Sequence, residues 1–456
     1  MTGGQQLRLT ACLAIPSIIA QFTSVLLQYI DAAMVGNLGA NPAASIGLVS
    51  TSTWILNGFA MAVCSGFSVQ VAHRCGAKDF RGAREIMRQG FTAAFCFGIL
   101  LSLIGTALSG PLPAWLGGDP VICDDASAYF RIYSLFLPFM ALGFASNAML
   151  QASGNTKVPS ILFMFMAVMD VVFNYLFIYL LGWGVPGAAM GTGLAEMSMA
   201  AVSLCYTCTR SPELRIKGEG GSFAPQGETV RNAFGITGPL WLQNIIMRGA
   251  YVVATIIVAP LGPVAIAANS FAITAESFCY MPGYGLQESA TTLVGQSLGA
   301  GRKQLARQFA HINISVAAVL MTMLGALMYA FAPELMGILT SDSRVIELGA
   351  KVLRIEAFAE TFYAVAMVSY GSCVGAGDTL VPTALNFASM WVVRIGLALL
   401  LTPKFGLVGY WIAMCAELNV RGILFLIRIR RGKWLNKRFV KAGGDAEPLE
   451  PGLEMN

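Results

Sequence analysis

Long apolar segments, each of a length that suits a lipid bilayer, follow one another along almost the whole chain. A helix needs about 20 predominantly apolar residues to cross a bilayer. This pattern predicts an all-α integral membrane protein with twelve transmembrane helices. The twelve predicted spans lie near residues 11–36, 43–72, 88–115, 127–151, 158–182, 186–208, 234–260, 264–297, 305–332, 346–375, 381–402 and 406–428.

A polar segment at 209–233 is the one long break in this pattern, and it divides the spans into six plus six. The segment contains several glycines and a proline, which favour loops over helix. We therefore predict an N-terminal lobe at 1–208 and a cytoplasmic linker at 209–233. A C-terminal lobe at 234–430 follows, and the chain ends in a basic and then acidic cytoplasmic tail at 431–456.

The two halves of the chain repeat each other at one constant offset in residue number. Pro16 matches Pro239, and at the same offset residues 154–159 (GNTKVP) match residues 377–382 (GDTLVP). Each half has an even number of predicted spans, so both halves face the same way across the membrane. We therefore expect two six-helix bundles related by a pseudo-two-fold axis along the membrane normal. Such a pair of bundles with a cavity between them suits a carrier that works by alternating access.

Composition excludes several classes of function. The hydrophobic fraction is 56%, the charged fraction is 12% and the mean hydropathy is +0.66. A soluble protein of this size needs a more highly charged surface. This excludes a soluble enzyme, a nucleic-acid-binding protein and a disordered chain, and it leaves lipid as the main solvent. With only two histidines, a His-ligated metal centre is not expected either.

The positions of the charges predict the orientation in the membrane. Most of the 29 Lys and Arg residues lie in segments that are cytoplasmic if both termini are cytoplasmic. Positive charge concentrates on the cytoplasmic side of membrane proteins, so we predict this orientation. The basic residues from Arg428 to Lys441 then lie beside the last span, where anionic lipid headgroups would meet them.

A few ionisable residues lie inside the predicted spans, where a charge costs at least about 2.5–3.5 kcal/mol. Asp31 lies in the outer part of the first span, and its repeat position holds Ala254. A carboxyl group there can take up and release protons, or it can ligate Na⁺. The alternative interpretation is an acid that reaches out to the membrane interface.

Span 5 contains a second set of polar residues. Asp170 and Asn174 lie four residues apart, so they share one face of a helix. Thr192 lies at the start of span 6. Together with Asp31 these residues make a plausible oxygen site for Na⁺ or a shared proton. The alternative role is interhelical hydrogen bonding.

The C-terminal spans carry both acids and bases. We interpret Arg248, Glu276, Glu360 and Arg394 as a polar network in which the arginines pair with glutamates. An unpaired buried charge would be destabilising, so this interpretation is mainly structural.

Several segments, in this order, resemble the multidrug and toxic compound extrusion (MATE) family over roughly residues 8–430. The resemblance rests on Pro16 and on residues 31–39 (DAAMVGNLG), 72–77 (AHRCGA), 151–156 (QASGNT), 174–178 (NYLFI), 184–189 (GVPGAA), 294–300 (VGQSLGA) and 375–379 (GAGDT). It implies twelve helices in two lobes and export of amphipathic, often cationic compounds in exchange for inward H⁺ or Na⁺. It also implies a location in a prokaryotic cytoplasmic (inner) membrane.

The resemblance assigns roles to individual residues. The family's N-lobe acid falls on Asp31, its span-5 polar pair on Asp170 and Asn174, and its span-6 threonine on Thr192. Pro16 lies where the first helix is thought to bend in DinF-like members.

Three positions depart from the family pattern. The first member of the span-5 pair is usually Asn and is Asp here. Span 7 offers Met247 and Arg248 where NorM-like members carry an acid, and their span-10 acid falls near Tyr363. These departures favour the DinF-like branch.

We therefore predict a secondary multidrug antiporter rather than an enzyme. We expect this antiporter to need no cofactor and to work as a monomer. Its partners would be a small amphipathic substrate, the coupling ion H⁺ or Na⁺, and membrane lipid. One alternative is a flippase of the same superfamily for lipid-linked oligosaccharide or lipid II, which would carry several basic residues in its cavity. A more distant alternative is a polytopic membrane enzyme.

Overall fold

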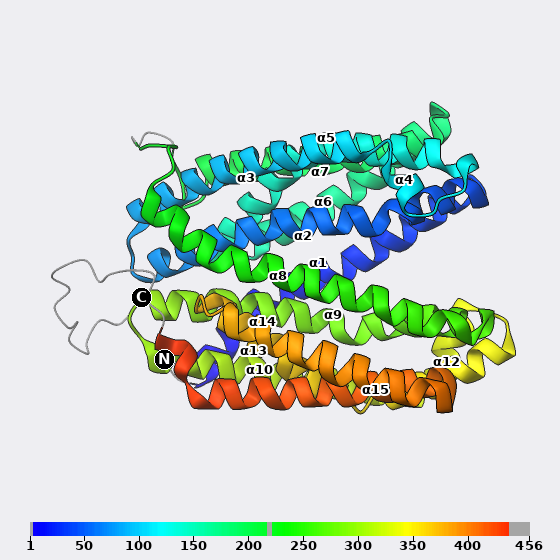
Figure 1. Cartoon of the computed structure of the whole chain (residues 1–456). Helices are drawn as coiled ribbons and strands as arrows, with labels where there is room; N and C mark the ends of the chain where they lie inside the picture. The colour runs from blue at the N-terminus through cyan, green and yellow to red at the C-terminus, as the bar shows by residue number, and fades with distance from the viewer. Residues whose placement is uncertain (1–2, 217–220, 437–456) are drawn as a thin grey trace.

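The computed structural model describes residues 3–216 and 221–436, which are almost entirely helical (Figure 1). Parts of the predicted linker (217–220) and of the predicted tail (437–456) lie outside the described residues. Ten helices in the described part are long and apolar enough to cross a membrane. The chain is therefore an integral membrane protein.

The first half of the chain forms what we call the N-bundle. Apolar residues dominate its long helices, and their buried faces share a core that includes Phe67, Met87, Leu137 and Met149. Its elements are α1 (Gly3–Gly36), α2 (Ala40–Gly76), α3 (Phe80–Leu108), α4 (Leu112–Trp115), α5 (Pro120–Ala152), α6 (Lys157–Asn174), the π-helical turn η1 (Tyr175–Leu180) and α7 (Gly184–Thr209). Apart from the short α4, they correspond to predicted spans 1 to 6.

The second half forms the C-bundle. Its core includes Met328, Leu353 and Trp411. Its elements are α8 (Gly227–Val258), the 3₁₀ turn η2 (Ala259–Leu261), α9 (Pro263–Gly299), α10 (Lys303–Ala330), α11 (Ala332–Leu339), α12 (Ser343–Glu356), α13 (Glu360–Gly375), α14 (Leu380–Phe387), the π-helical stretch η3 (Ala388–Ile395), α15 (Gly396–Arg431) and η4 (Lys433–Asn436).

Two differences explain why ten helices correspond to twelve spans. The predicted span 346–375 is broken into α12 and α13, and each piece alone is too short to cross a bilayer. Spans 11 and 12 form one helical stretch from Leu380 to Arg431, interrupted at Gly406, whose φ of 60° and ψ of −140° are not helical. The predicted fold of twelve spans in two six-helix bundles is thus confirmed.

The internal repeat extends to the helix boundaries. Helices α2 and α9 both contain 37 residues, and they begin and end at equivalent positions of the repeat. Each follows a glycine with positive φ, Gly39 (φ 120°) and Gly262 (φ 91°). Such a backbone conformation is freely available only to glycine. A Leu-Gly pair at equivalent positions therefore precedes the same helix in both bundles.

The two bundles meet most closely where α2 and α9 end. We call this the terminal end, because α1 begins and α15 ends there (Figure 1). A Cβ on Gly76 would lie 1.9 Å from the carbonyl oxygen of Gln296, and a Cβ on Gly299 would lie 1.9 Å from that of His73. These repeat-related contacts bring backbone against backbone, so the terminal end is closed.

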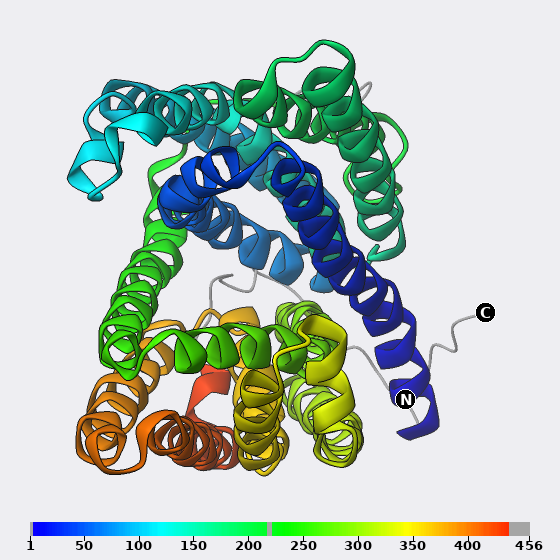
Figure 2. The ribbon, with the colours of Figure 1, turned by 90° about the vertical axis from the view of Figure 1, so that its right-hand side faces the viewer.

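In each bundle, one helix also packs against the other bundle. Helix α1 packs against α9, and its repeat partner α8 packs against α2. Figure 2 shows the molecule from the end opposite the terminal end, with α1 running from the N-bundle towards the level of the C-bundle. A displacement of α1 therefore changes packing contacts in both bundles.

Candidate functional site

Four polar side chains from three helices of the N-bundle meet in what we call the carboxyl site: Asp31 on α1, Asp170 and Asn174 on α6, and Thr192 on α7. Asn174 Nδ2 donates to Asp170 Oδ2 at 2.9 Å and to Asp31 Oδ1 at 3.1 Å. Thr192 lies close enough to Asp170 to interact with its carboxyl group. Asp170 and Asn174 are 0% and 2% exposed. The structure thus brings all four predicted residues together.

Local sequence explains how α6 presents this site. The spacing of Asp170 and Asn174 places them one above the other on one face. Directly after Asn174 the helix widens into the π-helical turn η1. Single π-helical turns within helices are frequent at functional sites.

A glycine on α7 completes the site, and sequence reasoning missed it. A Cβ on Gly191 would lie 2.1 Å from Asn174 Oδ1. Only a residue without a side chain lets α7 approach the amide so closely. The available signal was a glycine within a predicted helix, which often marks close packing.

The carboxyl site has two acids and no base. Among the residues that the structure describes, neither Asp31 nor Asp170 takes part in an ion pair. Asp170 Oδ1 and Asn174 Oδ1 are buried and have no hydrogen-bond partner. Two adjacent carboxylates in an apolar environment require a compensating cation. The oxygen atoms of this site suit either a proton or a hard cation such as Na⁺.

The helix that carries Asp31 is also attached to the C-bundle. Pro16 lies within α1, and Leu13 and Ala14 beside it are buried in clusters formed largely by C-bundle residues. Gln21 Nε2 donates to Glu288 Oε1 on α9 at 3.2 Å. Gln21 and Asp31 are ten residues apart, or about 15 Å along a helix. Helix α1 therefore links the carboxyl site to the other bundle.

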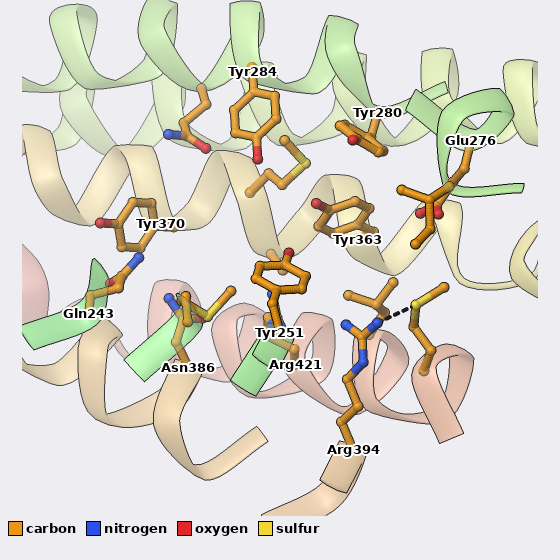
Figure 3. A pocket seen from close by; sticks show the side chains of 17 residues that line it. Gln243, Tyr251, Glu276, Tyr280, Tyr284, Tyr363, Tyr370, Asn386, Arg394 and Arg421 are labelled. Atoms are coloured by element: carbon orange, nitrogen blue, oxygen red, sulfur yellow. Dashed lines mark hydrogen bonds between the residues drawn. The ribbon is translucent and has the colours of Figure 1, made fainter. Parts of the chain in front are cut away.

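The C-bundle contains a cavity of 210 Å³ lined by both apolar and polar side chains, which we call the C-bundle cavity. Five tyrosines from three helices line it, together with Glu276, Arg394 and Arg421 (Figure 3). The tyrosines are Tyr251, Tyr280, Tyr284, Tyr363 and Tyr370. Sequence reasoning did not select them. Their signal was spacing, because Tyr280 and Tyr284 are four residues apart and Tyr363 and Tyr370 are seven apart on their helices.

The polar network of Arg248, Glu276, Glu360 and Arg394 stays a prediction, and within the described residues neither arginine forms an ion pair with a glutamate. The Arg248 guanidinium lies 5.4 Å from the ring centroid of Trp54 in the N-bundle instead. Arg394 Nη2 donates to the Tyr410 hydroxyl at 3.0 Å, and neither arginine has an ion-pair partner in the described ranges. Both carboxylate oxygens of Glu360 are buried without a hydrogen-bond partner. Sequence position alone does not give the rotation of a helix, so it could not select these partners.

A second cavity of 390 Å³ lies between the two bundles, and we call it the inter-bundle cavity. Its lining includes Gln151 from the N-bundle and Glu288 from the C-bundle. These two residues are within hydrogen-bond reach, since Gln151 Nε2 donates to Glu288 Oε2 at 3.5 Å. This cavity is a space that a change in the bundle–bundle contact would reshape.

The sequence matches the MatE family model over residues 16–176 and again over residues 239–400, once in each half of the repeat. The probable multidrug resistance protein NorM of Thermotoga maritima is 25% identical over 431 residues, covering 92% of each chain. The multidrug resistance protein MdtK of Yersinia enterocolitica is 25% identical over 441 residues, covering 93% of this chain and 95% of the relative.

Solved structures show the same fold. A mutant of the MATE transporter VcmN of Vibrio cholerae matches with a TM-score of 0.89 and 18% identity, covering 95% of this chain and 99% of that one. A multidrug resistance MATE family transporter in an outward-facing conformation matches with a TM-score of 0.89 and 20% identity, covering 96% and 99%. Because the family model matches most of the sequence, the chain belongs to the MatE family.

Proposed function

We propose that this MatE-family chain is a secondary antiporter that exports amphipathic, often cationic compounds in exchange for inward H⁺ or Na⁺. One observation carries the proposal: a single amide, Asn174, bridges two carboxyl groups that have no basic partner in the described chain. Such a site is stable only with a cation bound. The multidrug resistance names of the relatives NorM and MdtK support export of drugs as the work that this cation drives.

Helix α1 would transmit cation binding to the rest of the molecule. A bound cation removes the repulsion between Asp31 and Asp170, and this favours one packing of α1 against α6. The same helix contacts Glu288 on α9 through Gln21, so the preferred packing of α1 biases the contact between the bundles. Coupling then follows if the cation and the exported compound favour different arrangements of the bundles.

The orientation gives this cycle a direction. With both termini cytoplasmic, as the distribution of Lys and Arg predicts, the closed terminal end faces the cytoplasm. The described state is then the one that receives a cation from outside and releases substrate there. Helix α1 begins and α15 ends at this same end (Figure 1), which agrees with the predicted orientation, and we propose a location in the cytoplasmic (inner) membrane.

The coupling site lies in the N-bundle, which is the arrangement we expect of the DinF-like branch. The C-bundle supports this choice, since Met247 lies on the wall of the C-bundle cavity and Tyr363 contributes a ring where NorM-like members carry acids. The flippase alternative is disfavoured. Of the two arginines on this cavity wall, Arg421 is already paired with Glu417 at 2.6 Å.

Transport by purified protein in liposomes tests the proposal. We expect Asp31→Asn to reduce gradient-driven ethidium flux by about 10-fold or more, because coupling energies of this kind span roughly 5- to 150-fold. Imposing a pH gradient and a Na⁺ gradient separately identifies the coupling ion. Asp124→Asn is the matched control, since Asp124 is exposed near the start of α5. Full ethidium flux in Asp31→Asn would overturn the assignment.

A further inference from the structure

The C-bundle cavity lies outside the proposed coupling site and has the features of a binding site of its own. Its walls are aromatic, with Tyr280 packed edge-on against both Tyr284 (6.0 Å between centroids) and Tyr363 (5.8 Å). Figure 3 shows the Arg394 side chain below Tyr363 and the Glu276 side chain beside Tyr363, to its right. Aromatic walls with a few charged groups are typical of sites for small organic ligands.

The two arginines on this wall differ in a way that matters for binding. Arg421 is neutralised by Glu417, whose carboxylate lies 2.6 Å away. Arg394 is 6% exposed, its Nε has no hydrogen-bond partner, and no carboxylate of the described chain lies within ion-pair distance of it. Arg394 thus carries a buried positive charge without a direct ion-pair partner, and Glu276 and Glu417 act on it only from beyond ion-pair distance.

The positive charge of Arg394 is permanent, whereas the negative charge of the nearby acid Glu276 is not. A guanidinium does not lose its proton in a protein. Glu276, the acidic residue among the described lining residues, can instead be neutralised by a proton. The fixed charge of the cavity is therefore positive, and a ligand carboxylate could form paired hydrogen bonds with the guanidinium.

The volume limits the size of the ligand. An apolar protein cavity of about 150 Å³ accommodates benzene. The C-bundle cavity, at 210 Å³, therefore has room for one aromatic ring with a short polar substituent. A ring of that size would lie among the tyrosines while its substituent reached Arg394.

We propose that the C-bundle cavity is a second binding site, which takes a small aromatic carboxylate with its anionic group on Arg394 and its ring among the tyrosines. The ligand enters from the inter-bundle cavity, because Gln243, Gln287 and Tyr370 line both spaces. The site extends the chain's ligands to anions, a class that the carboxyl site would repel. Binding there does not depend on the proposed antiport.

Three probes of equal size and different charge test this proposal: benzoate, benzyl alcohol and benzylammonium. Binding to the full-length protein in detergent is measured by calorimetry and by saturation-transfer NMR. We expect benzoate to bind most tightly and Arg394→Gln to weaken it by about 10-fold or more, with Arg394→Lys intermediate. Arg248→Gln is the matched control, since that guanidinium lies on Trp54 and not on the cavity wall.

Other outcomes would overturn the proposal. If benzylammonium binds more tightly than benzoate, the Glu276 carboxylate determines the charge preference of the cavity, and the site binds cations instead of anions. If Arg394→Gln keeps both its thermal stability and its benzoate affinity, Arg394 is not the anion-binding group. If Arg394→Gln unfolds, the benzoate affinity of Arg394→Lys decides instead, because this variant keeps the positive charge and loses the planar pair of hydrogen-bond donors. Asp31→Asn should bind benzoate normally, which separates this test from that of the antiport.

Discussion

The carboxyl site of the N-bundle and the cavity of the C-bundle lie on the same repeated scaffold, yet they share none of their charged residues. The positions equivalent to Asp31 and Asp170 hold Ala254 and Val393 in the second half. The position equivalent to Arg394 holds Val171 in the first. The repeat therefore dictates where helices begin and end, while the chemistry of each bundle is specified separately.

The two sets of charges also differ in how they are compensated. The N-bundle has two acids bridged by one amide, so it needs an external cation. The C-bundle contains Arg421 and Glu417 as an internal ion pair between residues four apart on α15. We infer that the first arrangement responds to ion binding and that the second is structural. The predictions below test this division.

The largest effect should come from breaking the buried ion pair in the C-bundle. Arg421→Met leaves the Glu417 carboxylate, which is 0% exposed, without its ion-pair partner and should lower the free energy of unfolding by about 3–5 kcal/mol. Thermal unfolding in detergent, followed by tryptophan fluorescence, measures the loss. The double variant Arg421→Met/Glu417→Leu should recover most of it. Equal losses in the single and double variants would show that packing, not charge, is responsible.

The next effect concerns transport rather than stability. Asp170→Asn removes one of the two charges that attract the cation, and we expect coupled ethidium flux to fall by about 10-fold or more. Protein stability should hold or rise, because a buried charge is lost. Glu360→Gln in the C-bundle is the comparison, and it should leave the ratio of flux to imposed gradient unchanged. If both variants lose coupling equally, the division between the bundles is wrong.

A steric change at the carboxyl site should have a smaller effect. Gly191→Ala forces a methyl group against the Asn174 amide, and overpacking of this kind costs about 1–3 kcal/mol. We expect lower coupled flux with the protein still folded, because the amide can no longer bridge both carboxyl groups. Gly396→Ala is the control, since its Cβ would meet no neighbouring atom within 4 Å. Normal flux in Gly191→Ala would mean that the bridge is dispensable.

Much of this fold could be predicted because membrane helices leave a strong signal. Apolar length predicted the spans, and the constant offset between matching segments predicted the two bundles. The break between α12 and α13 could not be predicted, because residues 357–359 are apolar and carry no proline or glycine. The interruption at Gly406 lies at the start of predicted span 12, and the structure continues almost as one helix from span 11 to span 12.

The candidate site was predictable to a different degree. The spacing of Asp170 and Asn174 predicts a shared face, and the structure shows one. Their contact with Asp31 depends on how α1 crosses α6, which no local pattern specifies. The same limit explains Arg248, whose partner Trp54 comes from the other bundle through the crossing of α8 and α2. The sequence predicts which residues share a face of one helix, but it does not predict which residues of different helices come into contact.

The smallest effect should appear where the two bundles are most alike. His73 Nε2 donates to the Gly375 carbonyl oxygen at 2.9 Å, and Gln296 Nε2 donates to that of Ala152 at 2.8 Å. The two donors occupy equivalent positions of the repeat, and so do the two acceptors, so this pair of bonds closes the terminal end symmetrically. Removing one bond with Gln296→Ala should destabilise the closed state by about 0.5–1.5 kcal/mol.

Hydrogen–deuterium exchange can detect so small a change as faster local opening. The loss of about 1.4 kcal/mol would raise the exchange rate about 10-fold at the ends of α2 and α9. Gln304→Ala, at an exposed position on α10, serves as the control. Because the two bonds are equivalent, opening should rise at the His73 side as well as at the Gln296 side. Faster exchange confined to the end of α9 would mean that the bundles separate independently at the two contacts. The fold would then be symmetric, but the opening of the terminal end would not.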